Sequence, residues 1–422
     1  CGVGMVHQHF MLIPTLTVVE NVILSLDEKK AFINKKAVAD RIQEISQKYG
    51  LLVDPYAKVS TLTVGQQQRV EILKALYKNC DLLVLDEPTA VLTPQEIKEL
   101  FVAIRNLIAE DKAVIFISHK LNEVMEISKV ITILHLGKVV GSVNACDTNA
   151  RELASMMVGK EVSFEVARGE QKLGEVMLEV ENMHAKDVKG VETVRGLNMK
   201  VRAGEIYGIA GVDGNGQSEL IRGIVGLCKK TGTVRIGGED VWENGALKAR
   251  LAHIPEDRQG MGVVMQMPIR NNLVLDTFYD EKFTKGFFLD WKKVGAQSTY
   301  LIEHYGVKTP DASNPVSSLS GGNQQKVVLA KWMLTQPDVL ILDEPTRGID
   351  VGAKYEIYSV INDLAKSGKA IIIISSEMPE IIGTCDRTYV INEGAIAGEL
   401  VGSAMTQEAI MGCIMAHNRK GE

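Results

Sequence analysis

The segment DLLVLDEPTAVLTP occupies residues 81–94, and a close copy, DVLILDEPTRGIDV, occupies residues 338–351. The second segment begins 257 positions after the first (81 to 338), and the same offset aligns Gly65 with Gly322. Solenoid repeats have periods of only about 20–50 residues. The chain therefore contains a duplicated domain rather than a repeat array.

Both copies show the same order of predicted elements, and the second strand in each is a run of apolar residues. Strands without polar alternation are typical of parallel sheets covered on both faces. Strand–helix–strand alternation predicts an α/β doubly wound core, with ligands at the carboxyl ends of the strands. The predicted elements are a helix (Gln66–Tyr77; Asn323–Leu334), a strand ending in Asp-Glu (Leu82–Asp86; Val339–Asp343), a helix (Pro94–Glu110; Gly352–Ser367) and the apolar strand (Ala113–Ser118; Ala370–Ser375).

The second copy has an additional N-terminal part without a counterpart in the first. Its segments Glu175–Glu181 and Leu197–Arg202 alternate like the strands of an antiparallel flap. Residues Ile206–Ala210 then form an apolar strand that leads directly into a glycine-rich turn. Such a strand, turn and helix start is typical of a phosphate-binding segment.

Length and composition indicate a globular protein of more than one domain. The chain has 422 residues, 45% of them hydrophobic and 24% charged, which suggests two or three ordinary domains. The polar stretch 160–174, KEVSFEVARGEQKLG, predicts a short linker between a domain at 1–159 and a domain at 175–422.

The charge and the cysteines exclude several classes of protein. A net charge of −6 argues against a nucleic-acid partner, which normally requires a basic face. No apolar stretch approaches the roughly 20 residues that span a bilayer. The six cysteines are scattered without a CxxC pair, so free thiols are expected rather than disulfides or a metal site.

Residues 211–218, GVDGNGQS, match the phosphate-loop pattern except that Gln217 stands where a lysine is expected. Glycines in such a turn let backbone N–H groups converge on phosphate oxygens at a helix N-terminus. The hydroxyl of Ser218 is a candidate ligand for Mg²⁺. Because Gln217 brings no charge, we expect nucleotide binding here without fast hydrolysis. The candidate ATP-binding residues of this loop are Gly211, Gly214, Asn215, Gly216, Gln217 and Ser218.

The segments LVLDE (83–87) and LILDE (340–344) each place two carboxylates at the end of a strand. In each pair the aspartate, Asp86 or Asp343, is the candidate Mg²⁺ ligand. The glutamates Glu87 and Glu344 are the candidate catalytic residues, which would orient or deprotonate the attacking water.

The helix starts LSGGNQQK (319–326) and LTVGQQQR (62–69) resemble the signature sequence LSGGQ of ABC transporter ATPases. With the phosphate loop and the Asp-Glu strands, the resemblance covers essentially the whole chain.

The resemblance implies two P-loop NTPase cassettes, each with a mostly parallel sheet, helices, an antiparallel flap and a helical signature subdomain. It also implies that ATP and Mg²⁺ are the cofactors, and that the cassettes pair head to tail within the chain. Each ATP would then lie between the phosphate loop of one cassette and the signature of the other. The implied signature contacts are Ser320, Gly321, Gly322, Asn323 and Gln324 in the second cassette, and Thr63 and Gly65 in the first.

The resemblance assigns further residues and shows where the copies differ. Gln8, in MVHQHF, matches the glutamine loop that touches Mg²⁺, and Glu256 takes that position in the second copy. His119 matches the switch histidine and is the third candidate catalytic residue, but Ser376 occupies its position 257 residues later. Val64 replaces a signature glycine, whose close backbone approach a β-branched side chain would hinder.

These differences predict two unequal ATP sites. The first site combines Gln8, Asp86, Glu87 and His119 of the first cassette with the signature Ser320–Gln324 of the second, and every part present is favourable. Its phosphate loop is expected about 45 residues upstream of Gln8, the separation of Gly211 and Glu256 in the second copy. We therefore interpret the chain as N-terminally truncated and expect weak or no activity from it alone. The second site departs from the family at the lysine, glutamine, histidine and glycine positions, and is expected mainly to hold nucleotide.

Two cassettes on one chain most resemble the importers of ribose, galactose and related sugars, and a sister group that imports nucleosides. VHQHFMLIPTLTVVENV and LTVGQQQRVEILKAL favour the nucleoside group, with sugar import as the alternative. The resemblance implies transmembrane permease subunits and an extracytoplasmic solute-binding protein as partners, and a peripheral position at the cytoplasmic face of the membrane. Two further alternatives are a soluble ribosome-associated tandem-cassette protein, which would carry a longer charged linker, and a non-catalytic regulatory module.

Overall fold

The computed structural model describes residues 2–8, 10–26, 33–89, 92–135, 137–158, 173–187, 189–211, 214–243 and 250–418. The chain divides into two compact units, Cys1–Val162 and Ser163–Glu422. The predicted linker, 160–174, lies outside the described residues except for its last two positions.

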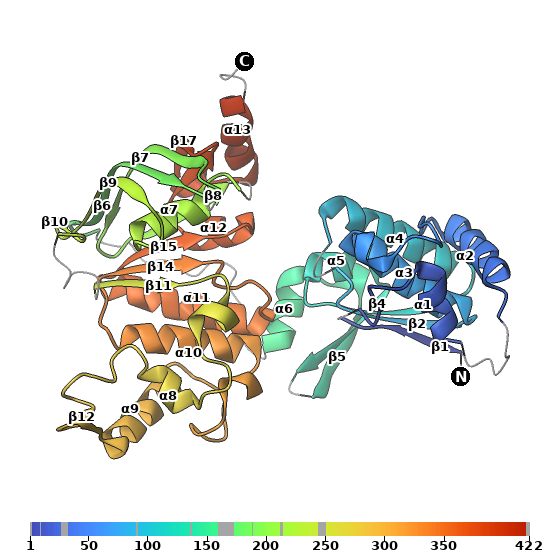
Figure 1. The fold of residues 1–422 in the computed structure, drawn as a ribbon, viewed down its shortest axis with the longest axis horizontal. Coiled ribbons are helices and arrows are strands. Elements are labelled where there is room, and N and C mark those ends of the chain that lie inside the picture. The colour runs from blue at the N-terminus through green and yellow to red at the C-terminus, as the bar shows by residue number, and fades with distance from the viewer. Residues whose placement is uncertain are drawn as a thin grey trace. The chain divides into compact units, whose positions relative to one another are not determined.

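The first unit is built from a small parallel sheet with helices, followed by a separate antiparallel hairpin (Figure 1). The parallel sheet has the order β1-β2-β3, and β4 pairs with β5. Its elements are β1 (Val3–Val6), α1 (Val18–Leu24), α2 (Lys35–Tyr49), α3 (Val64–Tyr77), β2 (Leu82–Asp86), α4 (Pro94–Ala109), β3 (Ala113–Ile117), α5 (Leu121–Ile127), β4 (Val130–His135), β5 (Lys138–Asn144) and α6 (Ala150–Val158).

Capping residues explain where two helices of the first unit begin. The hydroxyls of Thr63 and Thr93 accept hydrogen bonds from the backbone N–H three residues later, and the side chains at those positions, Gln66 and Glu96, bond back. Such a capping box satisfies donors that a helix start otherwise leaves unpaired. It accounts for α3 starting at Val64, two residues before the predicted start.

The second unit is a six-stranded sheet of order β11-β14-β15-β8-β16-β17, parallel except for β17, together with a four-stranded antiparallel sheet of order β10-β9-β6-β7. Its strands are β6 (Val176–Lys186), β7 (Glu192–Arg202), β8 (Ile206–Gly211), β9 (Lys230–Ile236), β10 (Glu239–Asp240), β11 (Leu251–Ile254), β12 (Thr284–Lys285), β13 (Phe288–Leu289), β14 (Val339–Asp343), β15 (Ala370–Ile374), β16 (Arg387–Asn392) and β17 (Ala395–Val401). Its helices are α7 (Gln217–Ile224), α8 (Ile269–Leu273), α9 (Trp291–His304), α10 (Gly321–Met333), α11 (Val351–Lys366), α12 (Met378–Thr384) and α13 (Gln407–Asn418).

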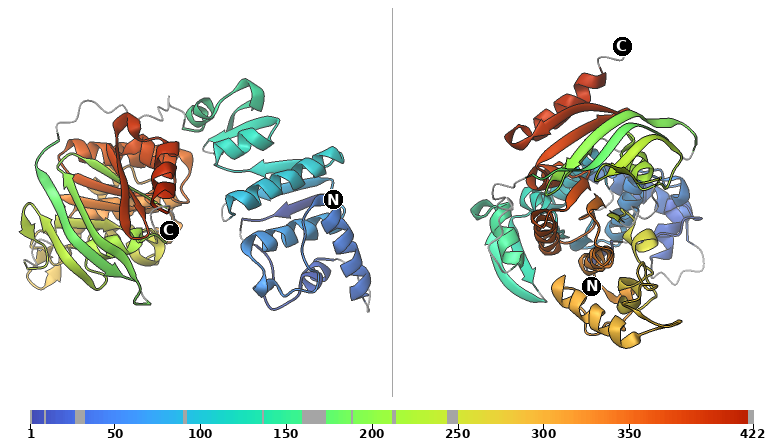
Figure 2. Two further views of the ribbon diagram at one scale, coloured as in Figure 1. Left: turned by 90° about the horizontal axis from the view of Figure 1, so that it is seen from above. Right: turned by 90° about the vertical axis from the view of Figure 1, so that its left-hand side faces the viewer.

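The central strands of this sheet divide their side chains between two hydrophobic cores. In β15, Ile372 and Ile374 face the core shared with α7 and the antiparallel sheet, whereas Ile371 and Ile373 face the core shared with α10 and α11. Figure 1 shows these layers in order, and Figure 2 shows the long green strands β6 and β7 from two further directions. This burial on both faces confirms the prediction from the apolar run.

In the first unit the same prediction is wrong for β3. Ile115 and Ile117 are 48% and 45% exposed, and Val3 and Met5 of β1 are also exposed. Within the described residues, β3 pairs only with β2, and the core of this unit covers one face of the sheet. In the second unit this face is covered by α7 and the antiparallel sheet, and the described part of the first unit has no counterpart of that sheet.

The predicted doubly wound α/β architecture is confirmed, with one difference between the units. The antiparallel flap is present in the second unit as β6, β7, β9 and β10, and the described part of the first unit has no equivalent sheet. Helices α8, α9 and α10 form the helical part that precedes β14. No helix within the described ranges is both long and apolar enough to cross a membrane.

Candidate functional site

The two Asp-Glu pairs adopt the same unusual backbone conformation at the ends of β2 and β14. Glu87 and Glu344 have φ angles of 45° and 47°, in the left-handed region that non-glycine residues rarely adopt. The N–H of each glutamate donates to the carbonyl that ends the neighbouring strand, Ile117 or Ile374, at 2.9 Å. Strained backbone of this kind concentrates at functional sites. No pattern in the sequence indicates this conformation, because the hydrogen bond that accompanies it comes from the neighbouring strand.

In the first unit two side chains hold the carboxylate of Glu87. Nδ1 of His119 lies 2.9 Å from Oε1, and Nε2 of Gln8 donates to Oε2 at 3.1 Å. Gln8 follows β1, Glu87 follows β2 and His119 follows β3, so three adjacent strand ends bring these residues together with Asp86, the last residue of β2. Three separate motifs of the sequence therefore converge, as the doubly wound fold predicts.

In the second unit an open cleft lies at the carboxyl ends of β8, β14 and β15, with about 530 Å³ of empty volume. It combines two of the predicted loop glycines, the Asp-Glu pair and the residues aligned with Gln8 and His119. Its polar and glycine lining consists of Gly211, Gly214, Gln217, Ser218, Glu256, Asp343, Glu344, Arg347, Ser375 and Ser376.

The described part of the phosphate loop requires glycine at two positions. Gly214 and Gly216 have φ angles of 87° and 100°, which favour glycine over any residue with a Cβ. A Cβ on Gly216 would also lie 2.2 Å from the carbonyl oxygen of Thr193. Residues 212 and 213 lie outside the described residues.

The side chains of Gln217 and Asn215 lie in different surroundings. Gln217 is buried, and its Nε2 lies 2.4 Å from the position of a Cβ on Gly211, against the end of β8. Asn215 donates to Oδ1 of Asn392 and accepts from the N–H of Glu393, so its side chain holds the turn after β16. ATP contact by Asn215 stays a prediction, and its observed role is structural.

Burial and the repulsion between carboxylates raise the pKa values of Asp343 and Glu344, two of the three acidic residues of this cleft. The pKa of Asp343 rises to about 7, mainly through burial and then through the charges of Glu256 and Glu344. Burial also raises the pKa of Glu344, although the N–H of Ser376 donates to its Oε1 at 2.6 Å and opposes this shift. Where the first unit places the His119 ring against the glutamate, the second places the backbone N–H and the side chain of Ser376.

Glu256 does not take the position relative to Glu344 that Gln8 takes relative to Glu87. Its Oε1 forms an ion pair with the Arg347 guanidinium, four residues beyond Asp343. The guanidinium of Arg258 donates to the backbone carbonyls of Arg347 and Gly348 at 2.8 and 3.3 Å. Sequence reasoning missed both arginines; the available signal was Arg347 in the second copy where the first has Ala90.

The chemistry of the cleft fits a magnesium nucleotide. Among the described residues, no group of three or more His, Cys, Asp or Glu is arranged to hold a metal on its own. Magnesium in nucleotide sites often takes one or two carboxylates and completes its shell with water and phosphate oxygens. The carboxylate of Asp343 and the hydroxyl of Ser218 are hard oxygen donors of the kind it requires, beside a glycine turn open to phosphate.

The two signature segments start helices in different ways. In the second unit Asn323 donates to the Ser320 hydroxyl at 2.9 Å, and the buried Gln324 donates to the Leu319 carbonyl at 3.0 Å. In the first unit the Thr63 hydroxyl is engaged in its capping box, and Val64 is 43% exposed. Nucleotide contact by these residues stays a prediction.

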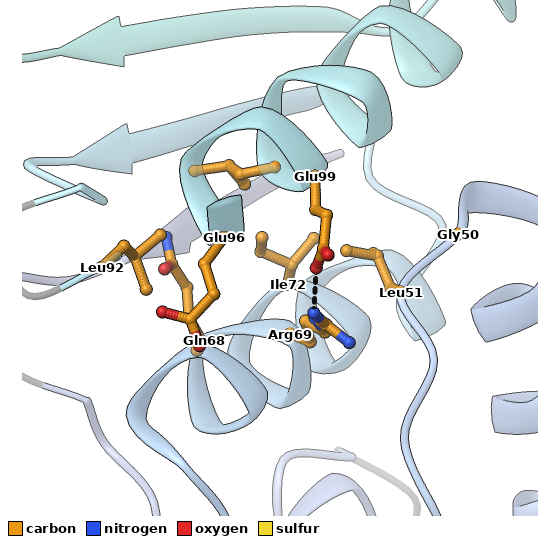
Figure 3. A pocket seen from close by; sticks show the side chains of 10 residues that line it. Gly50, Leu51, Gln68, Arg69, Ile72, Leu92, Glu96 and Glu99 are labelled. Carbon is orange, nitrogen blue, oxygen red and sulfur yellow. Dashed lines mark hydrogen bonds and ion pairs between the residues drawn. The ribbon is translucent and has the colours of Figure 1, made fainter. Parts of the chain in front are cut away.

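The glycines Gly65 and Gly322 have a packing role in their own units. A Cβ on Gly322 would lie 2.4 Å from Cβ of Ala353 on α11, and a Cβ on Gly65 would lie 2.1 Å from Oε1 of Glu96 on α4. Figure 3 shows the small cavity beside this contact, where Glu96 lies near the buried Gln68. Each glycine lets the signature helix approach the helix that follows the Asp-Glu strand.

The comparisons agree with this geometry. The family model described as ABC transporter matches residues 2–90 and 194–347, which hold both Asp-Glu pairs and the phosphate loop. The chain belongs to the ABC transporter family. Both units are thus ABC cassettes, and the family is one of ATP-binding ATPases.

Curated relatives of the ABC family match nearly the whole chain. The nucleoside import ATP-binding protein NupA of Lactococcus lactis is 42% identical over 98% of this chain and 83% of its own length. The guanosine import ATP-binding protein NupO of Bacillus subtilis is 43% identical over 100% and 83%. The ribose import ATP-binding protein RbsA of Clostridium perfringens is 41% identical over 97% and 82%.

A solved structure shares the fold of the ABC cassettes over most of the chain. The complex of archaeal ribosomal stalk protein aP1 with the ribosome recycling factor aABCE1 matches with a TM-score of 0.58. The match covers 98% of this chain and 76% of that chain at 20% identity. At this identity the similarity concerns the fold alone.

Proposed function

We propose that this chain is the ATP-hydrolysing subunit of an importer, at the cytoplasmic face of the membrane, and that it drives nucleoside uptake through a transmembrane permease. The observation that carries the proposal is the pair of Asp-Glu strand ends with left-handed glutamates, together with relatives named as import ATP-binding proteins. An extracytoplasmic solute-binding protein would deliver the solute. Nucleic acid is not expected as a partner, since the chain is acidic.

Nucleoside import is favoured over ribose import by the first-cassette strings quoted above and by the names of NupA and NupO. The identities of 42%, 43% and 41% do not separate the two solutes. The ATPase subunit does not bind the transported solute, so the permease has to be tested with it. The experiment is uptake of labelled guanosine and of labelled ribose by cells that carry this protein with the permease encoded beside it. ATP-dependent guanosine uptake is expected, and uptake of ribose alone would favour the sugar alternative.

The ribosome-associated alternative gains no support from the match to aABCE1, because that similarity concerns the fold alone. Sedimentation of the protein with ribosomes, in the presence and absence of ATP, tests it directly. We expect the protein to remain in the supernatant and to co-purify with permease subunits from solubilised membranes. Co-sedimentation without permease would reject the importer proposal.

We further propose that the two cassettes are unequal in hydrolysis. The first places Gln8 and His119 on the two oxygens of Glu87, so both groups can orient the carboxylate and the water it would activate. The second cassette has Ser376 instead of the histidine, and Glu256 pairs with Arg347. With Asp86 or Asp343 holding Mg²⁺, hydrolysis would be faster where Glu87 is the base.

A further inference from the structure

The ion pair of Glu256 and Arg347 is a feature of the second cleft that the family motifs do not explain. Arg347 lies in the turn after β14, and its backbone N–H donates to the backbone carbonyl of Glu344 at 3.2 Å. Its guanidinium pairs with Glu256. Both residues line the cleft together with Gly214 and Ser218 of the phosphate loop.

The two members of this pair occur together in one copy and are both absent from the other. The first copy has Gln8 where the second has Glu256, and Ala90 where the second has Arg347. An extra carboxylate beside a phosphate site repels an anionic ligand. A guanidinium in the same place compensates for that charge, so the two substitutions make sense as a pair.

Among the described residues that line the cleft, one cationic side chain is available to bind a polyphosphate. Its described lining holds three carboxylates, those of Glu256, Asp343 and Glu344, and Arg347 is the only lysine or arginine among these lining residues. Gln217 stands at the position of the phosphate-loop lysine. Arg222 of α7 also acts on Asp343 electrostatically, but it does not line the cleft.

Breaking the Glu256–Arg347 ion pair costs little free energy, because both side chains are partly exposed to solvent. The side chains of Arg347 and Glu256 are 62% and 44% exposed, and solvent-exposed ion pairs contribute only about 0–1 kcal/mol. A guanidinium can bind a phosphate, as it binds a carboxylate, through two parallel hydrogen bonds. Arg258 holds the turn through the backbone carbonyls of Arg347 and Gly348, so the turn does not depend on the Arg347 side chain.

We propose that Arg347 is the phosphate-binding cation of the second cassette, in place of the lysine that Gln217 does not supply, and that Glu256 holds it beside the cleft until the nucleotide phosphate displaces the carboxylate. The inference rests on the proposed function, that this cleft binds ATP. Under this proposal Glu256 competes with the nucleotide for the Arg347 guanidinium. Removing Arg347 should therefore lower the affinity for nucleotide, and removing the Glu256 charge should raise it.

The test is labelling of the intact chain by the photoreactive analogue 8-azido-ATP with Mg²⁺, assigned to the second cassette by peptide mapping. Arg347→Ala should weaken half-saturation about tenfold, the loss of one charge-assisted contact. Glu256→Gln should tighten it roughly threefold, because the guanidinium is released and a negative charge is removed. Arg347→Lys should fall between wild type and Arg347→Ala.

A matched control pair lies on the antiparallel sheet of the same unit, where Arg235 pairs with Glu181 at 2.6 Å. Arg235→Ala and Glu181→Gln should leave labelling unchanged. A purely structural role for the Glu256–Arg347 pair predicts that both of its single variants weaken labelling alike, and that outcome, or no change in either, overturns the inference. If the wild-type second cassette is not labelled at all, the proposed function fails instead.

Discussion

Nδ1 of His119 lies 2.9 Å from Oε1 of Glu87, whereas Ser376 takes the place of this imidazole beside Glu344. The corresponding carboxylate in the second cassette accepts its hydrogen bond from the backbone N–H of Ser376. The imidazole can therefore orient or protonate one glutamate but not the other. The difference gives the two cassettes distinct responses to substitution.

His119→Ala should lower the kcat of ATP hydrolysis about 10²-fold in the protein assembled with its permease, and change KM little, because positioned acid–base groups act mainly on the chemical step. Ser376→Ala is the matched control. The variant keeps the backbone hydrogen bond to Glu344 and loses only the hydroxyl, in the cassette that is proposed mainly to retain nucleotide, so it should hydrolyse ATP close to the wild-type rate. Equal losses from the two variants would contradict the assignment of His119.

The catalytic glutamates can be compared directly in the same assembly. Glu87→Gln removes the base that Gln8 and His119 hold and should reduce steady-state ATPase activity to background. Glu344→Gln should leave much of the activity, because the second cassette is proposed mainly to retain nucleotide. If the two variants lose activity to the same extent, the proposal of unequal cassettes is wrong.

Gly322→Ala should destabilise the second unit through a clash between two helices. The new Cβ would lie 2.4 Å from Cβ of Ala353, an atom fixed to the α11 backbone. Overpacking of this kind costs roughly 1–3 kcal/mol, and thermal unfolding should report it as a lower Tm. Adding Ala353→Gly should recover part of the loss.

Gly65→Ala is the comparison in the first unit. Its Cβ would meet the carboxylate end of Glu96, a flexible group that can move away. The cost should be smaller than for Gly322→Ala, although the capping box of Thr93 loses its partner when Glu96 moves. A loss larger than that of Gly322→Ala would mean that Glu96 is fixed in place.

Glu380 should make the second unit less stable as pH rises. Burial raises the pKa of this carboxyl from 4.5 to about 7, while the hydroxyls of Ser375 and Thr346 donate to it and partly oppose the shift. The folded state then binds the proton more tightly than the unfolded state, so stability is lost as pH rises from about 4.5 to 7.

Glu380→Gln removes that titration. Its advantage in free energy of unfolding over wild type should grow by roughly 1–3 kcal/mol between pH 4.5 and 7.5, measured by urea titration at each pH. Asp363→Asn, on the exposed face of α11, serves as the control and should show no pH-dependent difference. A constant difference across the range would place the effect of Glu380 in packing rather than in charge.

The duplicated strands could be predicted from sequence because their signal is local. The predicted bounds of β2 and β14, Leu82–Asp86 and Val339–Asp343, are those of the structure. The flap strand predicted at Glu175–Glu181 extends to Lys186, because irregular register near Asn182, where φ is 47°, lets pairing continue past a break in the alternation.

The site was predictable only where a motif carries the residue. Gln8, Glu87 and His119 were each recognisable, and the parallel sheet brings them together. Arg347 lies 91 residues from Glu256, and no local pattern links the two. Its partner depends on how the loop after β11 folds over the end of β14, which is tertiary information.

The half-exposed isoleucines of β3 have a practical consequence for work with the first unit alone. A strand that pairs on one side and carries Ile115 and Ile117 towards solvent offers free backbone groups and an apolar surface to any other extended segment. Neither lysine nor proline interrupts Ala113–Ile117, so the strand lacks the residues that usually block such pairing. A fragment of residues 1–162 should self-associate by strand addition, and Ile115→Lys should keep it monodisperse.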